Sequence, residues 1–366
     1  MDNYRPAPGT PIEELDTPCL LVDLDAVEHN FRVVADTFRD TACKMRQHTK
    51  NIKSPRLARM QISAGGTLHG VCTAKVSEAE VMVEGGIDDV LIANQVVTAD
   101  KIARLCALAK QGDMKVCVDN PRNVEELSRV AEAHGVALGV LIEVDTSMGR
   151  AGVRTAEHAV ELAALAQRLP GVRFRGVMSH QDLGEFRDHE ARALTAQRYI
   201  RICLDVKDAI EAAGIPVEMV SSGETFSYDA AAQIPGVSDV EGGTYALMGT
   251  EYSHMDEFEM AGKILSTVTS TPRPGVAIGD VGVRALGSPR GVLPTLEDVP
   301  GVTVEELHDE RIVLRSEGEM PLKVGDKFIL YSGQQDMLVN RWDQFIAIRN
   351  GVVEEVWDIP GRGCSY

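Results

Sequence analysis

The segment Arg46-Gln-His-Thr-Lys50-Asn-Ile-Lys53 follows a short strand-like run at residues 43–47 and precedes an expected helix. In a barrel of alternating strands and helices, this position carries a side chain to the carboxyl-terminal end of the strands, where active sites lie. A lysine there can form a Schiff base with an aldehyde, which few other side chains can do. Exposed lysines are common, so the segment alone fits two solvated cations, Lys50 and Lys53, equally well. The rest of the chain is needed to decide between these interpretations.

Short β-rich runs alternate with longer amphipathic helical patterns from residue 43 onward. The eight β-rich runs cover 43–47, 70–74, 89–94, 115–120, 138–145, 172–180, 217–222 and about 238–247. Helical spacing of apolar residues is found between them at 76–86, 99–111, 122–135, 155–168 and 188–214. Regular alternation implies parallel pairing, and eight units can close into a (β/α)8 barrel. An open doubly wound sheet is the competing architecture.

The pattern changes after about residue 255. Alternating apolar residues at 311–315, 328–331, 344–349 and 352–357 predict antiparallel strands. Asn350-Gly351 joins the last two and is a strong hairpin signal. One more strand is expected at 17–25, opening into a helix over 26–39. The sequence therefore predicts a barrel followed by a mostly antiparallel β domain.

Composition excludes several classes of partner. The chain has 37 basic and 55 acidic residues and a formal charge of -18, which argues against binding to a nucleic-acid backbone. No stretch approaches the roughly 18 uninterrupted apolar residues of a membrane helix, and the amino terminus shows no secretory signal. Seven cysteines without a CxxC pair indicate reduced, buried thiols. We expect a soluble cytoplasmic protein without nucleic-acid or membrane partners.

The lysine segment resembles the Arg-Pro-His-x-Lys-x-His-Lys signature of the D-threonine aldolase and D-serine dehydratase family, with Gln47 and Ile52 as departures. Further segments are similar to family motifs in the same order: Thr17-Pro-Cys-Leu-Leu-Val-Asp23, Ala74-Lys-Val-Ser-Glu-Ala-Glu80, Glu143-Val-Asp-Thr-Ser-Met-Gly-Arg-Ala-Gly-Val153 and the closing run 356–363. The resemblance implies an alanine-racemase-like (fold type III) TIM-type barrel with a second β domain, which the amino-terminal strand joins. We therefore expect a barrel over 26–254 and a β domain of 1–25 plus 255–366.

The resemblance also implies pyridoxal 5'-phosphate as the cofactor. Lys50 would hold it, and Arg150 would contact its phenolic oxygen, because an arginine cannot lose its proton. An ion pair of Arg150 with Asp145 is the structural alternative. Two glycine-containing turns, 221–225 and 241–245, resemble the phosphate-binding loops of the family. Their candidate cofactor-binding residues are Ser222, Gly223, Thr225, Gly242, Gly243 and Thr244, although Gly242 and Gly243 could simply relieve crowding.

Two histidines are candidate catalytic residues. His180 ends a predicted strand at the position where relatives carry a tyrosine, and His48 lies within the lysine motif. Either imidazole could contact the cofactor or act as a base near neutral pH. A purely structural histidine is the alternative at both positions.

The metal motif of the family is altered. Relatives bind a divalent metal through His-x-Asp or His-x-Cys, with the histidine six residues before an asparagine; here these positions carry Gln334 and Asp336 before Asn340. A glutamine oxygen suits Mg²⁺ or Mn²⁺ and is a poor zinc ligand. The site is therefore either altered or lost, and we favour its loss.

The resemblance implies a pyridoxal-phosphate-dependent lyase, similar to D-threonine aldolase, that cleaves a D-3-hydroxy amino acid to glycine and an aldehyde. A dehydratase or racemase acting on the same substrate class is the first alternative, and a non-catalytic pyridoxal-phosphate-binding protein is the second. A homodimer is expected from the family. The substrate would be a small-molecule amino acid.

Overall fold

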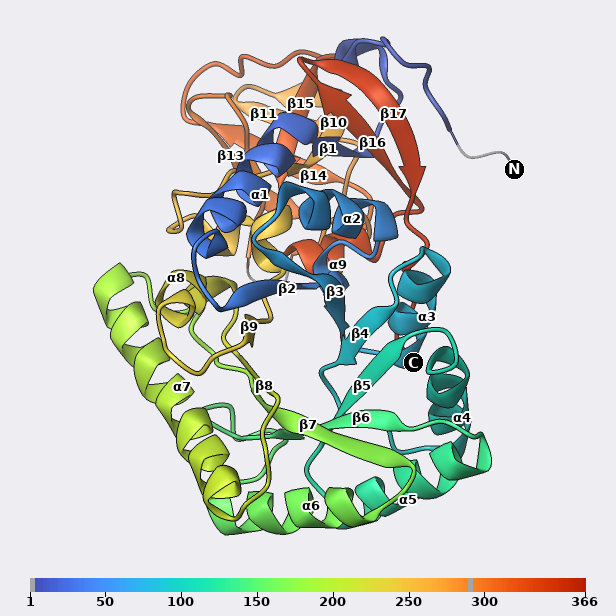
Figure 1. The fold of residues 1–366 in the computed structure, drawn as a ribbon. Coiled ribbons are helices and arrows are strands. Elements are labelled where there is room, and N and C mark those ends of the chain that lie inside the picture. Colours follow the sequence, from blue (N-terminus) through green and yellow to red (C-terminus); the bar gives the residue numbers. More distant parts are fainter. Residues whose placement is uncertain (1–3, 289–291) are drawn as a thin grey trace. The chain divides into compact units, whose positions relative to one another are not determined.

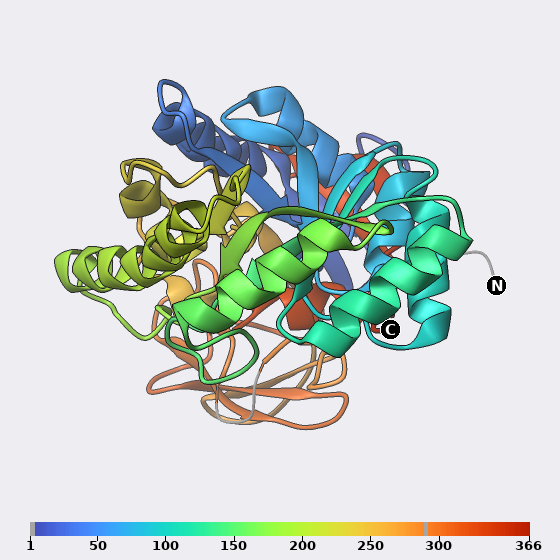
Figure 2. The same cartoon turned by 60° about the horizontal axis from the view of Figure 1, so that its bottom comes forward.

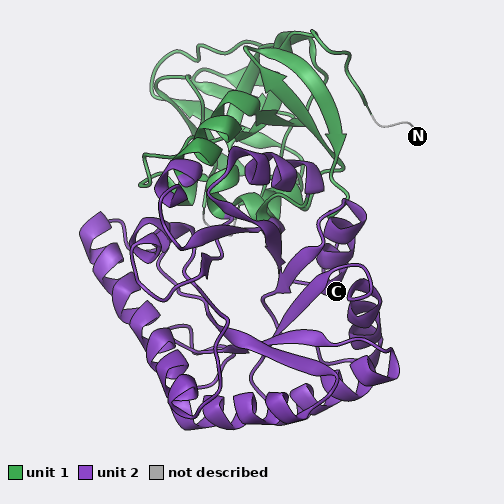
Figure 3. Ribbon diagram, viewed as in Figure 1, with its two compact units in different colours: residues 1–33, 51–53, 244–363 green, residues 34–50, 54–243, 364–366 purple. Residues whose placement is uncertain are grey.

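The computed structural model describes residues 4–288 and 292–366 and divides into two compact units (Figure 3). Unit 1 contains the chain up to Val33, the short piece Asn51–Lys53, and Thr244–Gly363. Unit 2 contains Val34–Lys50, Ser54–Gly243 and Cys364–Tyr366. Within the described residues, no helix has an apolar stretch long enough to cross a membrane.

Unit 2 is a closed barrel of eight parallel strands, so the predicted barrel is confirmed and the open sheet is excluded (Figure 1). The strands are β2 (Lys44–His48), β3 (Thr67–Thr73), β4 (Asp89–Ile92), β5 (Asp113–Val118), β6 (Leu138–Glu143), β7 (Val172–Ser179), β8 (Met219–Ser222) and β9 (Asp239–Val240). Their order around the barrel follows the sequence. The near-continuous apolar runs reflect burial of both strand faces, as in β6, where every residue is buried.

The last strand is much shorter than predicted. β9 ends at Val240, and the run 238–247 continues through Gly242 and Gly243 into the 3-10 helix η4 (Thr244–Ala246). β9 pairs with β8 at one position, Ser221 opposite Asp239, and with β2 at two. Regular pairing ends at Val240, because the Gly242 N–H donates to Val240 O and Met45 Sδ. The Gly242 carbonyl still accepts the His48 N–H of β2 at 2.7 Å.

The barrel helices lie outside the strands that they connect (Figure 2). They are α2 (Pro55–Ala64), α3 (Val76–Glu84), α4 (Ala99–Leu108), α5 (Pro121–Ala133), α6 (Ala156–Arg168), α7 (His189–Ala212) and α8 (Tyr228–Ala232), with 3-10 helices η2 (Thr49–Asn51) and η3 (Thr225–Ser227). Side-chain caps start three of them: Asn120 accepts the Arg122 N–H, Thr155 the His158 N–H and Asp188 the Ala191 N–H. Such caps satisfy donors that the helix itself leaves unpaired.

Charged side chains fill part of the barrel interior. Arg46, from the predicted lysine signature, is 2% exposed and lies 3.0 Å from Asp89 and 3.4 Å from Asp239. Lys115 Nζ is 2.7 Å from Asp89. Buried charges persist in a protein only when they are paired in this way. Arg46 therefore has a structural environment, distinct from that of Lys50 four residues later.

Unit 1 is built on a mostly antiparallel sheet, as the sequence predicts. The sheet order is β13 (Val302–Leu307), β14 (Ile312–Ser316), β11 (Val276–Gly279), β10 (Gly262–Arg273), β1 (Cys19–Asp23), β16 (Gln344–Arg349) and β17 (Val352–Asp358), with β15 (Lys327–Tyr331) pairing to β10 and β12 (Thr295–Leu296). β1 is antiparallel to β10 and parallel to β16. Asn350 and Gly351 have φ of 50° and 74°, the left-handed conformation of a tight hairpin turn. The remaining elements of unit 1 are α9 (Gln335–Val339), η1 (Ile12–Glu14) and η5 (Thr250–Tyr252). The helix α1 (Leu24–Phe38) is divided between the units after Val33.

Candidate active site

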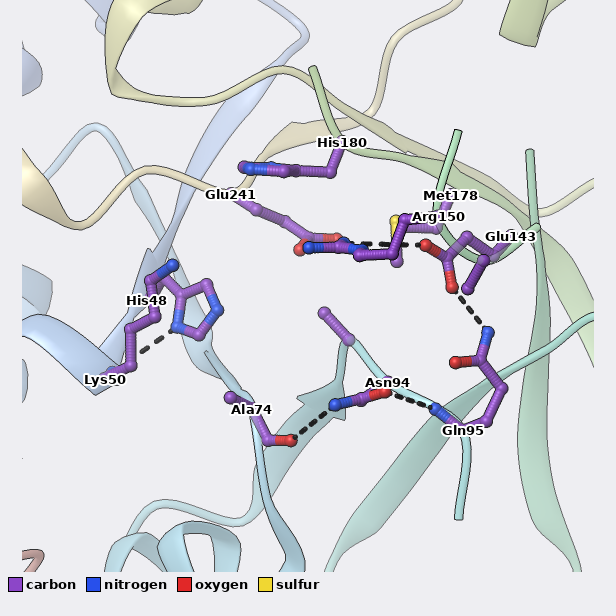
Figure 4. Close-up of a pocket in the computed structure, with 12 residues that line it drawn as sticks. His48, Lys50, Ala74, Asn94, Gln95, Glu143, Arg150, Met178, His180 and Glu241 are labelled. Carbon is purple, nitrogen blue, oxygen red and sulfur yellow. Dashed lines mark hydrogen bonds and ion pairs between the residues drawn. The ribbon is translucent and has the colours of Figure 1, made fainter. Parts of the chain in front are cut away.

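A pocket of about 190 Å³ lies at the carboxyl-terminal ends of the barrel strands (Figure 4). A concave site with a few convergent polar groups is typical of small-molecule binding. Active sites of (β/α)8 barrels lie at this end. The lining residues come from or just after β2, β3, β4, β6, β7 and β9: His48, Lys50, Ala74, Ala93, Asn94, Gln95, Glu143, Arg150, Ala151, Met178, His180 and Glu241. The structure thus brings together four residues predicted from the sequence, which are Lys50, His48, Arg150 and His180.

Lys50 stands in η2, two residues after β2 ends. Its backbone N–H donates to His48 Nδ1 at 3.4 Å, which ties the turn to the strand end. Among the described residues, its side-chain nitrogen has no hydrogen-bond or ion-pair partner, although the side chain is only partly exposed. An unpaired amine in a concave site is chemically available, unlike a lysine held in an ion pair. This placement fits a reactive lysine better than a solvated one.

Arg150 is held by Glu143 and not by Asp145. The guanidinium lies 3.7 Å from Glu143 Oε1, whereas Asp145 pairs with Arg154 at 3.1 Å. Gln95 Nε2 donates to the other oxygen of Glu143. Glu143 is only 4% exposed, and burial raises the pKa of its carboxyl group. The Arg150–Asp145 pair expected as the structural alternative is therefore wrong, because the loop after β6 turns Asp145 toward Arg154.

His180 follows β7 and is uncharged near neutral pH. Burial, and then the positive charges of Lys50 and Arg150, lower the pKa of its imidazole to about 3. Glu224 Oε2 lies 3.9 Å from His180 Nε2, and burial raises the pKa of that carboxyl group to about 8. Both groups are therefore neutral at pH 7, and the contact is not an ion pair. A neutral imidazole at the pocket wall can accept a proton or a hydrogen bond.

Glu241 is a pocket residue that the sequence analysis missed. It follows β9 directly and is 4% exposed. Its Oε1 lies 2.8 Å from Ser221 Oγ, and its Oε2 accepts from Cys72 Sγ at 3.2 Å. Burial raises the pKa of Glu241 to about 7. The sequence does contain a signal for Glu241, since a carboxylate stands beside a glycine pair at the end of a predicted strand. The sequence analysis interprets this run only as a phosphate-binding loop.

The predicted phosphate-binding residues of unit 2 do not line this pocket. Ser222 ends β8, and its hydroxyl is 2.7 Å from Ser179 Oγ. The two glycine turns are joined, because the Gly243 N–H donates to Thr225 Oγ1 at 3.1 Å. Gly223 has φ of 120°, in the region that favours glycine. These residues and Gly242 lie at the strand ends next to the pocket-lining Glu241, whereas Thr244 belongs to unit 1.

The candidate metal ligands both lie in unit 1, around the start of α9. Gln334 Nε2 donates to Glu251 Oε2 at 2.7 Å, and Asp336 Oδ1 accepts the Met337 N–H at 2.9 Å. In the part of the chain that the structure describes, no three His, Cys, Asp or Glu side chains are grouped to hold a metal ion. As arranged, the Gln334 amide presents a donor to Glu251, and this does not fit a ligand set for a cation.

Comparison with known proteins identifies the family of the chain. The model of the alanine racemase N-terminal domain matches residues 22–245. The chain belongs to this family. A serine dehydratase domain model matches residues 261–348, which lie in the antiparallel part. Family membership, predicted from motifs that follow the order of the family, is confirmed.

Several members of the alanine racemase-like family match the chain over nearly its full length. A 3-hydroxy-D-aspartate aldolase from Paracoccus denitrificans (strain Pd 1222) is 36% identical, covering 98% of this chain and 95% of the relative. A D-threonine aldolase from an Arthrobacter species is 34% identical over 98% of this chain and 96% of the relative. The crystal structure of a D-threonine aldolase from Filomicrobium marinum has a TM-score of 0.94 at 33% identity and covers 99% of this chain and 100% of that one.

The donor set of the pocket fits the cofactor that the family implies. Pyridoxal phosphate needs a lysine amine for its aldehyde, a permanent cation for its phenolate and backbone N–H groups for its phosphate. Lys50 supplies an amine without a partner among residues 4–288 and 292–366, and Arg150 a cation that cannot lose its proton. The joined turns at Gly223 and Gly243 lie at neighbouring strand ends. Lys50 and Arg150 are therefore suitable for this group, and the turns lie beside the pocket, with the Gly243 N–H bound to Thr225.

Proposed function

We propose that the protein is a pyridoxal-phosphate-dependent lyase that cleaves a D-3-hydroxy amino acid into glycine and an aldehyde. The observation that carries the proposal is Lys50, whose side-chain nitrogen has no partner among the described residues and lies in a pocket at the carboxyl-terminal end of the barrel. Two aldolases match 98% of the chain, which supports the same interpretation. The substrate is a small-molecule amino acid, a proposal that the two aldolase relatives support.

Different residues in and beside the pocket hold different parts of the cofactor. Lys50 binds the cofactor through its side-chain nitrogen, and Arg150 offers its positive charge to the phenolic oxygen. Ser222, Gly223, Thr225, Gly242, Gly243 and Thr244 are the proposed phosphate ligands. When bound, the cofactor supplies a sink for the electron pair that the breaking Cα–Cβ bond leaves on the α-carbon. His48, whose Nδ1 accepts the Lys50 N–H, fixes the turn that presents the lysine.

Cleavage also needs an acceptor for the proton of the β-hydroxyl, and we assign this role to His180. Its imidazole is neutral at pH 7, so it can take up a proton without first losing one. The positive charge of Lys50 is one cause of its lowered pKa. The imidazole becomes a stronger base once the lysine nitrogen carries no charge.

No step of the proposal requires a metal ion. Gln334 stands where relatives carry a histidine, and its amide nitrogen donates to Glu251 at 2.7 Å. The same departure favours the dehydratase or racemase alternative, since neither reaction strictly needs a metal to polarise the hydroxyl. Both alternatives use the same lysine and the same substrate class.

The deciding experiment is product identification by mass spectrometry. Purified protein loaded with pyridoxal phosphate is mixed with a panel of D-3-hydroxy amino acids that includes D-threonine and 3-hydroxy-D-aspartate. We expect glycine and the matching aldehyde, no product from Lys50→Ala, and full activity from the control Lys110→Ala, which removes an exposed lysine.

Other outcomes separate the alternatives. A 2-oxo acid with ammonia would establish a dehydratase, and loss of optical purity without cleavage a racemase. Uptake of the cofactor without any product would leave the non-catalytic binding protein. Equal activity of Lys50→Ala and wild type would overturn the assignment of the site itself.

We further propose a cytoplasmic homodimer. The family resemblance supports the dimer, and its mass is measured by light scattering after size-exclusion chromatography. All seven cysteines are unbonded, and six are buried, in keeping with a reducing compartment.

A further inference from the structure

Glu224 is a buried carboxyl group that has no role in the reaction as proposed so far. It stands between Gly223 and Thr225 in the turn after β8, and it is 7% exposed. Its backbone N–H donates to Ser227 Oγ at 3.0 Å, which fixes where the side chain leaves the turn. Its Oε2 lies 3.9 Å from Nε2 of His180, the imidazole assigned as the proton acceptor. A carboxyl group this close to an imidazole affects how the imidazole binds protons.

The two oxygens of Glu224 have different partners, and this decides where its proton lies. Oε1 accepts the Leu183 N–H at 3.1 Å. In a carboxylic acid the carbonyl oxygen is the better acceptor, so Oε1 is the carbonyl oxygen and the acidic hydrogen is on Oε2. Protonated Glu224 therefore presents an O–H to His180 Nε2, whereas ionised Glu224 presents an acceptor.

The two forms of Glu224 favour different tautomers of the neutral imidazole. Opposite an O–H, Nε2 of His180 keeps its lone pair and the ring hydrogen is on Nδ1. Opposite a carboxylate, Nε2 carries the hydrogen and Nδ1 keeps a lone pair, because the partner of one ring nitrogen sets the state of the other. His180 forms part of the pocket wall (Figure 4). With Nε2 directed at Glu224, Nδ1 is the nitrogen that remains for the substrate, and only the second tautomer lets it accept a proton.

The surroundings of Glu224 set the pH at which it changes form. Burial raises the pKa of this carboxyl group to about 8. The Leu183 N–H and the charge of Lys50 oppose the rise, and the charge of Asp182 adds to it. From α7, Arg192 donates to two backbone carbonyls nearby. Glu224 is therefore mostly protonated at pH 7 and mostly ionised at pH 9.

We propose that Glu224 is a positioning residue for His180, which as a carboxylate holds the imidazole in the tautomer that accepts the β-hydroxyl proton and as an acid holds it in the other. The proposal rests on the proposed function in one respect, namely that His180 takes up this proton.

The proton transfer balances without any exchange at Glu224. The O–H bond of the substrate breaks and an N–H bond forms at Nδ1 of His180. The electron pair left on the oxygen forms the carbonyl group of the aldehyde, while the pair of the breaking Cα–Cβ bond stays on the α-carbon. Nε2 keeps its hydrogen throughout. The negative charge of Glu224 stabilises the imidazolium that results.

The first test is the pH dependence of kcat for the protein loaded with cofactor. Between pH 7 and pH 9 we expect wild-type kcat to rise about 10-fold, because an acid of pKa about 8 goes from roughly one-tenth to nine-tenths ionised. In Glu224→Gln the amide oxygen takes over the Leu183 N–H, and the amide NH₂ faces His180 as the protonated acid does. We therefore expect a low kcat without this rise, and an unchanged KM.

Two variants of neighbouring carboxylates complete this test. Asp182→Asn removes a negative charge that raises the pKa of Glu224, so the rise in kcat should move to lower pH. The exposed Glu185→Gln should keep the wild-type profile. Loss of a merely structural contact would lower activity at every pH and would not move the profile.

The second test reads the tautomer without depending on turnover. It uses nitrogen NMR of the holoprotein labelled with ¹⁵N in its histidines, with His180→Asn to assign the signals. In the wild type we expect the ring hydrogen of His180 on Nδ1 at pH 7 and on Nε2 at pH 9. In Glu224→Gln we expect it on Nδ1 at both pH values.

The outcomes separate this inference from the proposed function. The same His180 tautomer at pH 7 and pH 9 in the wild type, or a rise in kcat that persists in Glu224→Gln, overturns the role of Glu224 and leaves the lyase intact. Absence of cleavage with every substrate overturns the proposed function, and the spectra then decide whether Glu224 controls the tautomer. Should Glu224→Gln fold poorly, Asp182→Asn decides, since an unshifted profile contradicts the inference.

Discussion

The carboxylate of Glu143 lies 3.7 Å from the guanidinium of Arg150, and this contact joins the last residue of β6 to the loop that follows it. The arginine side chain is 56% exposed, whereas the carboxylate is 5% exposed. A long side chain with this much freedom would otherwise sample many rotamers. The buried anion thus limits where the positive charge of the pocket can lie.

Replacing Glu143 tests this restraint. Glu143→Gln keeps the shape of the side chain and removes its charge, so Arg150 loses its anchor. We expect kcat/KM to fall by roughly 10- to 100-fold, as for loss of a charge-assisted hydrogen bond, with little loss of thermal stability. Steady-state kinetics with the exposed Glu161→Gln as control measure the effect. Unchanged kinetics would mean that Arg150 needs no anchor.

Replacing His180 tests the proton acceptor. His180→Asn keeps a polar side chain but cannot take up a proton, so we expect kcat to fall about 10²- to 10⁴-fold. The absorption of the bound cofactor should remain, because Lys50 is untouched. The exposed His134→Asn is the control. A variant with normal kcat and a raised KM would give His180 a binding role instead.

Ionisation of Glu224 is expected to make the free energy of unfolding depend on pH. The pKa of this carboxyl group is raised from 4.5 to about 8 in the folded chain, mainly by burial. Between these values the folded state keeps a proton that the unfolded state has released, so the free energy of unfolding falls as pH rises toward 8. Glu224→Gln removes this loss, which is on the order of 3–5 kcal/mol.

Urea unfolding of the cofactor-free protein at pH 5 and pH 9 measures this effect. The variant should gain stability over the wild type at pH 9 and show little gain at pH 5. The exposed Glu185→Gln should follow the wild type at both pH values. Parallel curves for wild type and Glu224→Gln would show that the carboxyl group titrates normally.

Gly223 tests how closely the turn after β8 is packed. Its φ is 120°, and an added Cβ would lie 3.1 Å from both Ala231 Cβ and Val240 Cγ1. Gly214→Ala is the matched control, since φ there is 82° and an added Cβ would meet nothing within 4 Å. We expect Gly214→Ala to cost about 1 kcal/mol and Gly223→Ala about 2–3 kcal/mol, with loss of cofactor affinity only in the second. Thermal unfolding and cofactor titration measure both; equal costs would mean that the turn is not crowded.

The altered metal motif predicts insensitivity to chelators. Because the Gln334 amide nitrogen donates to Glu251 and stands where relatives carry a histidine ligand, we expect dialysis against EDTA to leave the activity unchanged. In Gln334→His, an imidazole stands beside Asp336, and we expect activity that Mn²⁺ raises and EDTA removes. Loss of wild-type activity on dialysis, restored by added Mn²⁺, would contradict the prediction.

The sequence predicts the barrel well because each part of the pattern has its own physical cause. Strands buried on both faces read as apolar runs such as Leu138–Glu143, and apolar residues at helical spacing predict the helices between them. Asn350-Gly351 predicts the final hairpin because both residues tolerate positive φ. These signals are local, so a single sequence contains them.

The pocket is predicted less completely because its contacts are not local. Whether Glu241 points into the barrel depends on where β9 ends, and the sequence extended that strand to 247 when it stops at Val240. Asp145 was the nearest carboxylate to Arg150 in sequence, yet it caps the Gly149 N–H and pairs with Arg154. Glycines at 149 and 152, with φ of 60° and 104°, make that turn. The path of this turn cannot be predicted from the sequence separation of Asp145 and Arg150.

The brevity of β9 has a consequence for the lifetime of the protein. In the regular ladder β9 has one residue pair with β8 and two with β2, fewer than the other described barrel strands have with their neighbours. Glu241 and the joined turns of Thr225 and Gly243 lie next to β9. A ligand bound to these residues would stabilise the pairing of β9 with its neighbours. Because the ligand binds only to the closed barrel, ligand binding would shift the equilibrium between open and closed barrel toward the closed form. Because proteolysis follows the population of open chains, the supply of cofactor would set how long each molecule survives.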